Sequence, residues 1–404
     1  MLDIWPALPL IIKEVGHHNI GSVDNVVAAL KCSDRVCQID LEVNWTSDLK
    51  RFLAAMQQPF PELTHLGLRW YGEDKSVVVP DLFLDGFAPR LEYLGLSGVP
   101  FPGLPKLLLS ATHLVHLRLP AIPHSGYISP DVMATALSTL TSLEYLLLQF
   151  KSPESCPDLE TRRLPPSTRS VLPVLTTFEF MGVSEYLEDL VTDIDVPQLN
   201  KLSIRFFNDS VFDTPQLIRL ISRTPMSSAL EEAHIALEAR TARISFGPQI
   251  RGHVDLKVSI LCEGMDWQLS SLEQVCTSCL PFLSMLNDLY IYEYPHSRPD
   301  WKANIENLIW LGLLHPFTTV KDLYISKTIA PHIGPALREG RTTNVLPSLE
   351  NIFLEELESS GPVQKEIGQF VTARQVSSHP VTISHWKNSE KDKATRWVKR
   401  VVRR

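Results

Sequence analysis

The chain has 404 residues, a net charge of −8, 44% hydrophobic residues and 21% charged residues. These are values of a folded globular protein, and they argue against extensive disorder. The charge is uneven, because residues 386–404 carry eight Lys or Arg against two acidic residues, which leaves −14 on the first 385 residues. An acidic body of this kind argues against a general nucleic-acid binder, and we expect no nucleic-acid partner.

Targeting signals and cysteine usage narrow the class of protein and its cellular compartment further. No run of about 18 apolar residues occurs, and the apolar stretch near the N-terminus lacks the basic lead and cleavage site of a signal peptide. Six cysteines are too few for a disulfide scaffold in a chain of this length. We therefore expect a soluble intracellular protein, cytoplasmic or nuclear, with reduced thiols.

A short unit of the form L-x-x-L-x-L recurs along the chain, and its clearest copy is Leu91, Leu94 and Leu96. Successive copies as far as Leu230 start 23 to 32 residues apart, close to the leucine-rich-repeat period of about 20 to 29. The first residues of the copies are Val36, Leu63, Leu91, Leu114, Leu143, Leu175, Leu199, Leu230, Leu286, Val320 and Leu349.

The unit predicts the architecture. Side chains alternate along a strand, so the fourth and sixth residues of each unit give it one apolar face. A single such strand cannot bury that face, and neighbouring units must stack to make a continuous core. We expect an α/β protein: an irregular leucine-rich-repeat solenoid, horseshoe-shaped, with a concave parallel β-sheet and a convex side of helices and irregular segments. Pro precedes the first apolar residue by two places in five copies, and it is suited to ending a return.

Along the first half of the chain, residues 1–35 are expected to form an N-terminal cap with a helix after Ser22 or Asp24. Helix patterns follow at three places: after Ser47 as N-cap, after Ser129 with Pro130, and from Thr214 with Pro215 to a stop before Pro225. The returns at 69–88 and 97–112 are rich in Gly and Pro and are expected to be irregular. Residues 151–170 are expected to form a long exposed loop.

In the second half, alternation at 254–260 predicts a strand whose place in the repeat is ambiguous. Longer helical returns are expected at 270–279, 301–314 and 329–338. A helix near 363–374 and a strand at 381–383 would close the array. The predicted organisation is therefore a cap at 1–35, a solenoid of about 12 repeats at 36–385 and a basic tail at 386–404.

The C-terminal third resembles a known family. The residues that carry the likeness are 266–272 (DWQLSSL), 289–293 (LYIYE), Trp301 with 304–307 (NIEN), 316–317 (PF), 320–324 (VKDLY), 345–349 (VLPSL) and 351–355 (NIFLE). They resemble the repeat region of a large family of F-box/leucine-rich-repeat proteins in mushroom-forming fungi (agaricomycetes), strongly from about 260 to 386. The resemblance implies the substrate receptor of a cullin-type ubiquitin ligase, in which an F-box docks to the ligase's linker subunit and the repeats hold a target protein.

The chain departs from that family at its N-terminus, where no F-box is visible. Residues 5–9 (WPALP) are similar to the segment that follows an F-box, and residues 8–12 (LPLII) have a faint likeness to its start. Two interpretations stay open: a gene model that lacks its F-box, or a repeat scaffold or inhibitor without ligase contact.

The third, fifth and seventh residues of each unit should face outward. In early units these positions hold Gln38, Asp40, Glu42, His65, Arg69, Tyr93, His116, Arg118, Tyr145 and Gln149. In late units Tyr290, Tyr292, Tyr324 and Phe353 should form an exposed aromatic cluster, flanked by Asp288, Asp322 and Glu355. Tyr is favoured in binding hot spots, so we predict that this cluster contacts a partner protein. The alternative is cross-strand stacking of the rings, or cover by the tail.

Metal and catalytic signals are weak. His65 and His116 hold equivalent positions two repeats apart and should not converge on a metal. Cys276 and Cys279 form a lone C-x-x-C, better explained as buried helix cysteines than as a zinc or redox site. His17 and His18 with Cys32 and Cys37 fit no standard ligand spacing. No nucleophile elbow, phosphate loop, dinucleotide fingerprint or zinc-protease motif occurs, so we predict no catalytic, cofactor-binding or metal residues and no enzyme.

The tail places Trp397 and Val398 among Lys and Arg residues. As a helix it would be a basic amphipathic segment able to touch an acidic partner, a membrane surface or the protein's own acidic body. The alternative is a solvated, disordered end. We expect no membrane contact.

Overall fold

The computed structural model describes residues 8–14, 20–72, 77–156, 169–207, 212, 214–225, 230–247, 255–262, 265–294, 307–339, 345–355, 362–376 and 379–386. The chain divides into two compact units, Met1–Asn200 (unit 1) and Lys201–Arg404 (unit 2), and each combines a β-sheet with helices. Among the described helices none is long and apolar enough to cross a bilayer.

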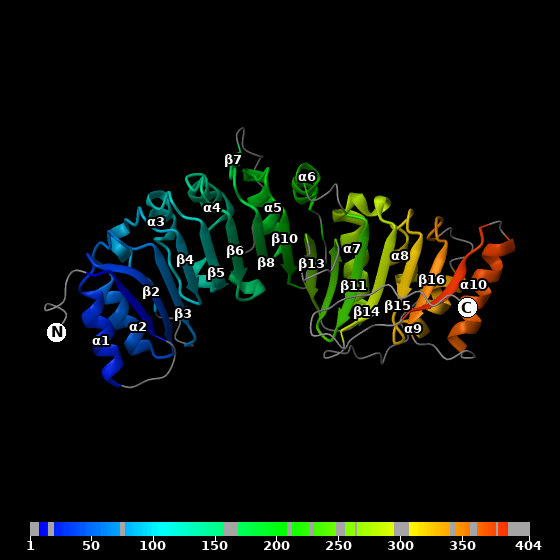
Figure 1. The fold of residues 1–404 in the computed structure, drawn as a ribbon, viewed down its shortest axis with the longest axis horizontal. Coiled ribbons are helices and arrows are strands. Elements are labelled where there is room, and N and C mark those ends of the chain that lie inside the picture. The colour runs from blue at the N-terminus through cyan, green and yellow to red at the C-terminus, as the bar shows by residue number, and fades with distance from the viewer. Residues whose placement is uncertain are drawn as a thin grey trace. The chain divides into compact units, whose positions relative to one another are not determined.

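The sheet of unit 1 is parallel, and its strands follow one another in chain order (Figure 1). Consecutive copies of the repeat pair in register, so that Leu66 lies opposite Leu94 and Leu94 lies opposite Leu117. The strands are β1 (Leu10–Glu14), β2 (Val36–Val43), β3 (His65–Trp70), β4 (Tyr93–Ser97), β5 (His116–Ile122), β6 (Tyr145–Phe150) and β8 (Thr177–Gly182). Two short strands, β7 (Ser170–Val171) and β9 (Ile194–Asp195), form a separate parallel pair.

Helices and short 3-10 turns connect the strands of unit 1, and α3, α4 and α5 cover the same side of its sheet (Figure 1). The helices are α1 (Ile20–Leu30), α2 (Thr46–Ala55), α3 (Leu104–Ser110), α4 (Pro130–Leu137) and α5 (Ser184–Asp193). The 3-10 turns are η2 (Phe83–Gly86), η3 (His124–Gly126) and η4 (Pro153–Ser155).

The sheet of unit 2 contains a reversal, because the strand order is β10, β13, β12, β11, β14, β15, β16, β17. β12 runs antiparallel to both neighbours, whereas the remaining pairs are parallel. The strands are β10 (Lys201–Phe206), β11 (Glu232–Glu238), β12 (Thr241–Phe246), β13 (Leu256–Leu261), β14 (Asp288–Glu293), β15 (Asp322–Ile325), β16 (Asn351–Glu355) and β17 (Thr382–Trp386). The ambiguous strand near 254–260 is therefore one arm of an inserted antiparallel meander.

The helices of unit 2 follow its parallel strands, and α7, α8, α9 and α10 pack on one another in sequence. They are α6 (Pro215–Arg223), α7 (Met265–Cys279), α8 (Asn307–Leu314), α9 (Ala330–Glu339) and α10 (Pro362–Val376), with the 3-10 turn η7 (Pro281–Met285). These helices confirm the helical segments predicted from the sequence near 270–279, 301–314, 329–338 and 363–374. Residues 301–306 lie outside the described residues.

The core of each unit is built from the apolar rows of the repeat. Leu66, Leu94 and Leu117 are fully buried in unit 1, as are Leu289 and Ile291 in unit 2. The outward third positions next to them in unit 1, His65, Tyr93 and His116, remain half-exposed or exposed. Burying a Leu side chain stabilises a fold by about 1.5–3 kcal/mol, so these rows are the main source of stability.

The same turn precedes each of the strands β3, β4, β5, β6 and β8. The amide of the first repeat residue donates to the carbonyl three residues earlier, as in Leu63 to Phe60 (3.2 Å) and Leu91 to Ala88 (3.2 Å). Pro61 and Pro89 occupy the second position of these turns, where the fixed φ of proline is favoured and no amide donor is needed. This geometry explains why the sequence places Pro two residues before the first Leu.

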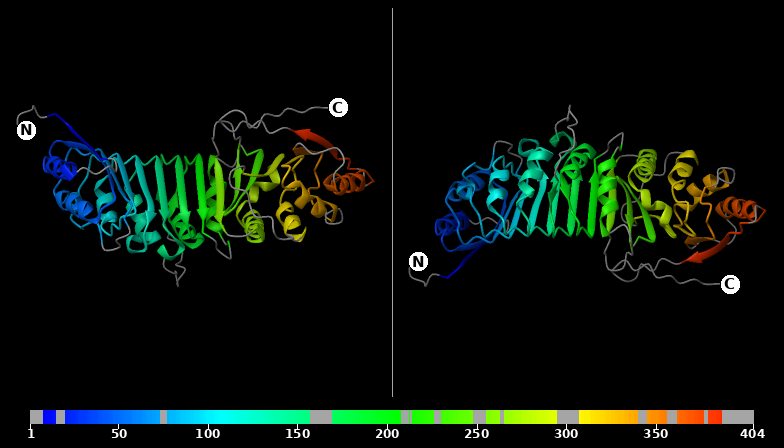
Figure 2. Two further views of the ribbon diagram at one scale, coloured as in Figure 1. Left: turned by 90° about the horizontal axis from the view of Figure 1, so that it is seen from below. Right: turned by 90° about the horizontal axis from the view of Figure 1, so that it is seen from above.

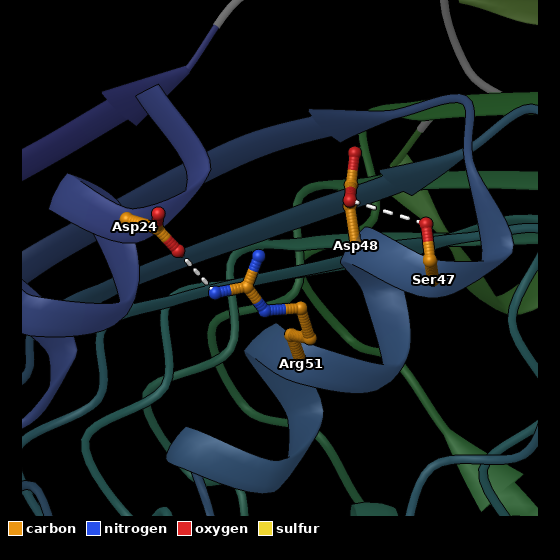
Figure 3. Close-up of polar contacts among 4 residues, drawn as sticks. All are labelled: Asp24, Ser47, Asp48 and Arg51. Carbon is orange, nitrogen blue, oxygen red and sulfur yellow. Dashed lines mark hydrogen bonds and ion pairs between the residues drawn. The ribbon is translucent and has the colours of Figure 1, made fainter. Parts of the chain in front are cut away.

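The helix α2 confirms the return predicted after Ser47, but the predicted N-cap is wrong. Trp45 is the N-cap, and the Ser47 hydroxyl donates to the Asp48 carboxylate at 3.2 Å (Figure 3). One turn further along, Arg51 forms an ion pair with Asp24 of α1, which ties the cap helix to the first return.

Several other expectations are confirmed or corrected. α4 and α6 begin with Pro130 and Pro215 as predicted. The return at 97–112 is not irregular, because Leu104, Leu107 and Leu108 are the buried side of α3. β1 lies inside the expected cap, where it pairs with β2. Most of the predicted loop at 151–170 lies outside the described residues.

Candidate functional site

The outer face of each sheet is the face turned away from the buried aliphatic rows. In unit 1, one row of this face carries a ring on each of four neighbouring strands. His65 lies opposite Tyr93, Tyr93 opposite His116 and His116 opposite Tyr145. We call these four residues the unit 1 ladder. The regular parallel pairing of β3, β4, β5 and β6 places them in line. The strands of this part of the sheet lie side by side in Figure 2.

The rings of the unit 1 ladder contact one another but remain accessible. His65 and Tyr93 stack with centroids 4.1 Å apart and planes 7° from parallel. His116 lies 6.2 Å from Tyr93 and 5.9 Å from Tyr145 in tilted arrangements. His116 is exposed and the other three are half-buried. The row is therefore an ordered aromatic surface in contact with solvent.

Two glycines next to the ladder allow this arrangement. A Cβ on Gly95 would lie 3.0 Å from the hydroxyl oxygen of Tyr93, so the absence of a side chain lets the Tyr93 ring lie along its own strand. A Cβ on Gly67 would lie 2.8 Å from the Asp40 carboxylate oxygen. The two glycines neighbour each other across β3 and β4. Their bare backbone makes room for the tyrosine ring and the carboxylate.

Charged groups flank the ladder at both ends. Arg69 bridges Asp40 (3.2 Å) and Glu42 (2.7 Å). At the other end the Arg118 guanidinium lies 5.4 Å from the centre of the Tyr145 ring, within cation–π range. Arg118 is exposed. The face thus offers aromatic rings together with an accessible guanidinium.

Burial changes the titration of two ladder residues. Burial lowers the pKa of His65, which a nearby Asp40 opposes and Lys13 reinforces. Burial, followed by the charge of Glu179, raises the pKa of Tyr145 to about 12. Both shifts favour the neutral form of these two rings.

Tyr290, Tyr324 and Phe353, chosen from the sequence, belong to a second row in unit 2, at the fifth position of the repeat instead of the third. His234 stacks on Tyr290 (4.4 Å), Tyr290 on Tyr324 (4.2 Å) and Tyr324 on Phe353 (4.5 Å), with planes within 10° of parallel. We call these four residues the unit 2 ladder. Stacking was the alternative left open by the sequence.

The prediction that this late cluster is exposed is wrong. Tyr290, Tyr292, Tyr324 and Phe353 are only 4–7% exposed. Parallel strands hold equivalent rings at stacking distance, so each ring covers the faces of its neighbours, and Tyr294 packs against the cluster. Burial also raises the pKa of Tyr290 and of Tyr324 well above the ordinary range. Binding of a partner at this cluster stays a prediction.

The flanking polar residues lie where the sequence placed them. Asp288 and Asp322 are neighbours across β14 and β15, and both are half-buried. The Asn351 amide donates to Asp322 at 2.8 Å. Glu355, at the far end of β16, accepts from the Lys327 backbone amide at 3.2 Å.

The other candidate residues are placed only in part by the structure. His65 and His116 are separated by Tyr93, and the described residues contain no group of three or more His, Cys, Asp or Glu suited to a metal. Cys276 is buried in α7, while the Cys279 side chain, His17 and His18 lie outside what the structure describes. A cavity of about 20 Å³ in the core of unit 1, lined by Phe150 and Tyr186 among others, has room for about one water molecule.

The unit 1 ladder was missed as a group, although each member was identified as outward-facing. The signal is present in the sequence, because each of the four residues is the third residue of its L-x-x-L-x-L repeat. His234 of unit 2 was missed because the repeat at Leu230 lies in the inserted meander.

Comparisons with known proteins are sparse. No family model matches the sequence, and no curated protein matches it. Among solved structures, the chain is similar to the leucine-rich repeat-containing protein LegL7 from Legionella pneumophila, at 12% identity and a TM-score of 0.31, over 89% of this chain and 96% of that one. Because this TM-score is low, the repeat architecture is inferred from the strand register within each unit and not from this likeness.

Proposed function

We propose that this chain is a leucine-rich-repeat solenoid that binds another protein and performs no catalysis. The proposal is supported by repeat units that pair in register and bury one aliphatic row after another. A sheet of this kind leaves a broad outer face whose side chains are not needed for the core. That face is the natural place for a binding surface.

The unit 1 ladder is the observation that carries the proposal. Tyr and Arg are enriched among residues that dominate binding energy, because they combine a large contact area with a polar tip. Tyr93 and Tyr145 are already ordered by their ring contacts, so binding would immobilise little that is mobile beforehand. His116 and Arg118 are exposed beside them.

The test is affinity capture with a double variant, His116→Glu with Arg118→Glu. Both side chains are exposed, so the exchange alters the face without opening the core. A matched control is Lys106→Glu with His315→Glu, which changes similar exposed side chains elsewhere. We expect partners held by the wild type and the control to be lost from the ladder variant. Equal recovery with all three proteins would contradict the assignment.

The finer role we propose is target recognition for an F-box type ubiquitin ligase, and its support is the resemblance of residues 260–386. A scaffold or inhibitor without ligase contact is the second candidate. Leu10 and Ile12 lie in β1 and pair with β2, so the segment with a faint likeness to the start of an F-box is a strand of the sheet.

Capture with the ligase's linker subunit separates the two roles. The natural full-length product should co-purify with that subunit if it is a substrate receptor. Absence of the subunit from a preparation that still holds a target protein would support the scaffold.

A further inference from the structure

Arg118 is an exposed cation in the middle of the outer face of unit 1. It lies on β5, opposite Gly95 of β4 and Leu147 of β6. Its guanidinium lies over the Tyr145 ring, and among the described residues it forms no ion pair. The outward positions of the two flanking strands hold no carboxylate, because they are Tyr93, Gly95, Ser97, Tyr145, Leu147 and Gln149.

The carboxylates of the same face are engaged elsewhere. Asp40 and Glu42 both pair with Arg69, at 3.2 and 2.7 Å. Glu179 of β8 lies opposite Leu147, one strand beyond β6, and forms a hydrogen bond with the Tyr145 hydroxyl. Water can solvate an exposed guanidinium, so this arrangement costs the free protein little. It leaves Arg118 available to an anion from another molecule.

The contact with Tyr145 leaves the hydrogen-bonding edge of Arg118 free. A guanidinium on an aromatic ring uses its flat face for that contact, whereas its N–H groups point outward in the plane of the group. This edge matches the two oxygens of a carboxylate in a bidentate pair. The Tyr145 ring is itself held by His116 at 5.9 Å, so the support of the guanidinium is already ordered before binding.

Two further donors lie beside Arg118. The Tyr93 ring lies along its own strand, with its hydroxyl oxygen 3.0 Å from the position of a Cβ on Gly95, and Gly95 is the residue opposite Arg118. His116 is exposed on the same side of β5, two residues before Arg118. Neither the Tyr93 hydroxyl nor the His116 ring has a hydrogen-bond partner among the described residues. We call Tyr93, His116 and Arg118 the donor cluster.

We propose that the outer face of unit 1 binds an acidic segment of a partner protein, with an Asp or Glu carboxylate of that segment on the donor cluster. The proposal rests on the protein-binding function proposed above and names the chemistry of the partner. Apolar or proline residues on either side of the acidic residue would lie on the rings of the unit 1 ladder.

The size and charge of the face favour this occupant. The ladder from His65 to Tyr145 spans three strand spacings, about 14 Å, which is the length of about four extended residues. One guanidinium suits a single carboxylate better than the repeated phosphates of a nucleic acid. Charges more than about 8 Å away are largely screened at physiological salt, so Arg118 decides the preference more than the net charge of −8 does.

Selection of short random peptides on phage, with the full chain as bait, tests the proposal. We expect the wild type to enrich peptides with Asp or Glu next to an aromatic residue or proline. Arg118→Glu should reverse this preference and enrich Lys or Arg instead. Lys106→Glu, the same change of charge at an exposed position of α3, is the matched control and should keep the acidic preference. An acidic preference that persists in Arg118→Glu would overturn the proposal.

The affinity of the best wild-type peptide gives a second readout. Arg118→Gln should weaken its binding at least about tenfold, because hydrogen bonds between charged groups are strong. Replacing the acidic residue of the peptide by its amide should have a similar effect. The two changes together should cost little more than either one, since they remove the same contact. Losses that simply add would show that the two groups do not meet.

The results separate this proposal from the broader one. Peptides without an acidic preference that are lost in His116→Glu with Arg118→Glu would overturn the carboxylate contact and support the binding face. Enriched peptides that this double variant holds as well as the wild type would count against both. No enrichment of any peptide would overturn the acidic segment and leave the face to a folded partner. Displacement of the peptides by single-stranded DNA, or self-association through this face, would indicate another occupant and also overturn the proposal.

Discussion

His65 and Tyr93 stack ring on ring across two neighbouring strands, 4.1 Å apart and 7° from parallel. Each comes from the same position of its repeat, so the contact reports the register of the sheet directly. Because both rings remain half-exposed, the same contact supports the fold and prepares a binding surface.

Gly95 is required for that geometry. In Gly95→Ala the new Cβ would lie 3.0 Å from the Tyr93 hydroxyl oxygen and would push the ring off the sheet. We expect loss of the stacking contribution, about 0.5–1.5 kcal/mol, measured as the free energy of unfolding in urea. The double variant with Tyr93→Leu should recover part of the loss. If Gly95→Ala is as stable as wild type, the ring does not lie where we place it.

Stability should fall on acidification, and His65 should contribute to the fall. Burial lowers its folded pKa below the ordinary value of 6.5, so the unfolded chain binds the proton more tightly. The stabilisation is fully present above pH 6.5 and is lost as pH falls through the lowered folded value. Urea unfolding between pH 7.5 and pH 5 should therefore give a flatter profile for His65→Gln. An identical slope in both proteins would contradict this reading.

The aliphatic rows should dominate stability. Leu94 is fully buried between equivalent residues of two repeats, and Leu94→Ala should cost about 2–5 kcal/mol. Leu109 is 51% exposed on α3, and the same exchange there should change stability by less than about 0.5 kcal/mol. Thermal unfolding of the two variants compares them. Similar losses at both positions would mean that the rows are not the core.

Replacing His234 should stabilise unit 2. His234→Phe keeps a ring in the stack with Tyr290 and removes two buried nitrogens that have no hydrogen-bond partner among the described residues. We expect a gain of about 1 kcal/mol or more in unfolding free energy, set by the cost of an unsatisfied buried group. Tyr290→Leu, which breaks the stack, is the contrasting variant and should destabilise. A loss of stability in His234→Phe would show that the imidazole makes a contact that benzene cannot.

The sequence predicts the aliphatic rows well. Side chains alternate along a strand, so Leu94 and Leu96 must lie on the same face, and that apolar face must be buried. The sequence predicts the helices that open with Ser129 or Thr214 before Pro for the same local reason. α3 was missed because Gly and Pro around it hide the helical spacing of Leu104, Leu107 and Leu108.

The candidate site could be predicted only in part, because the local sequence sets the direction of a side chain along a strand but does not set how deeply that side chain is buried. The outward direction of Tyr290 and Tyr324 follows from alternation along a strand. Their exposure depends on neighbouring strands and on what covers the sheet, which no local pattern contains. The repeat of parallel units likewise gives no sign of β12, which runs antiparallel between β11 and β13.

Photo-cross-linking from the outer face of unit 1 tests the central claim most directly. A benzoylphenylalanine placed at His116 occupies an exposed position within the ladder, and one placed at Leu109 occupies an exposed position on α3. We predict covalent capture of a partner from position 116 and none of that partner from position 109. Capture from position 109 alone would contradict the account.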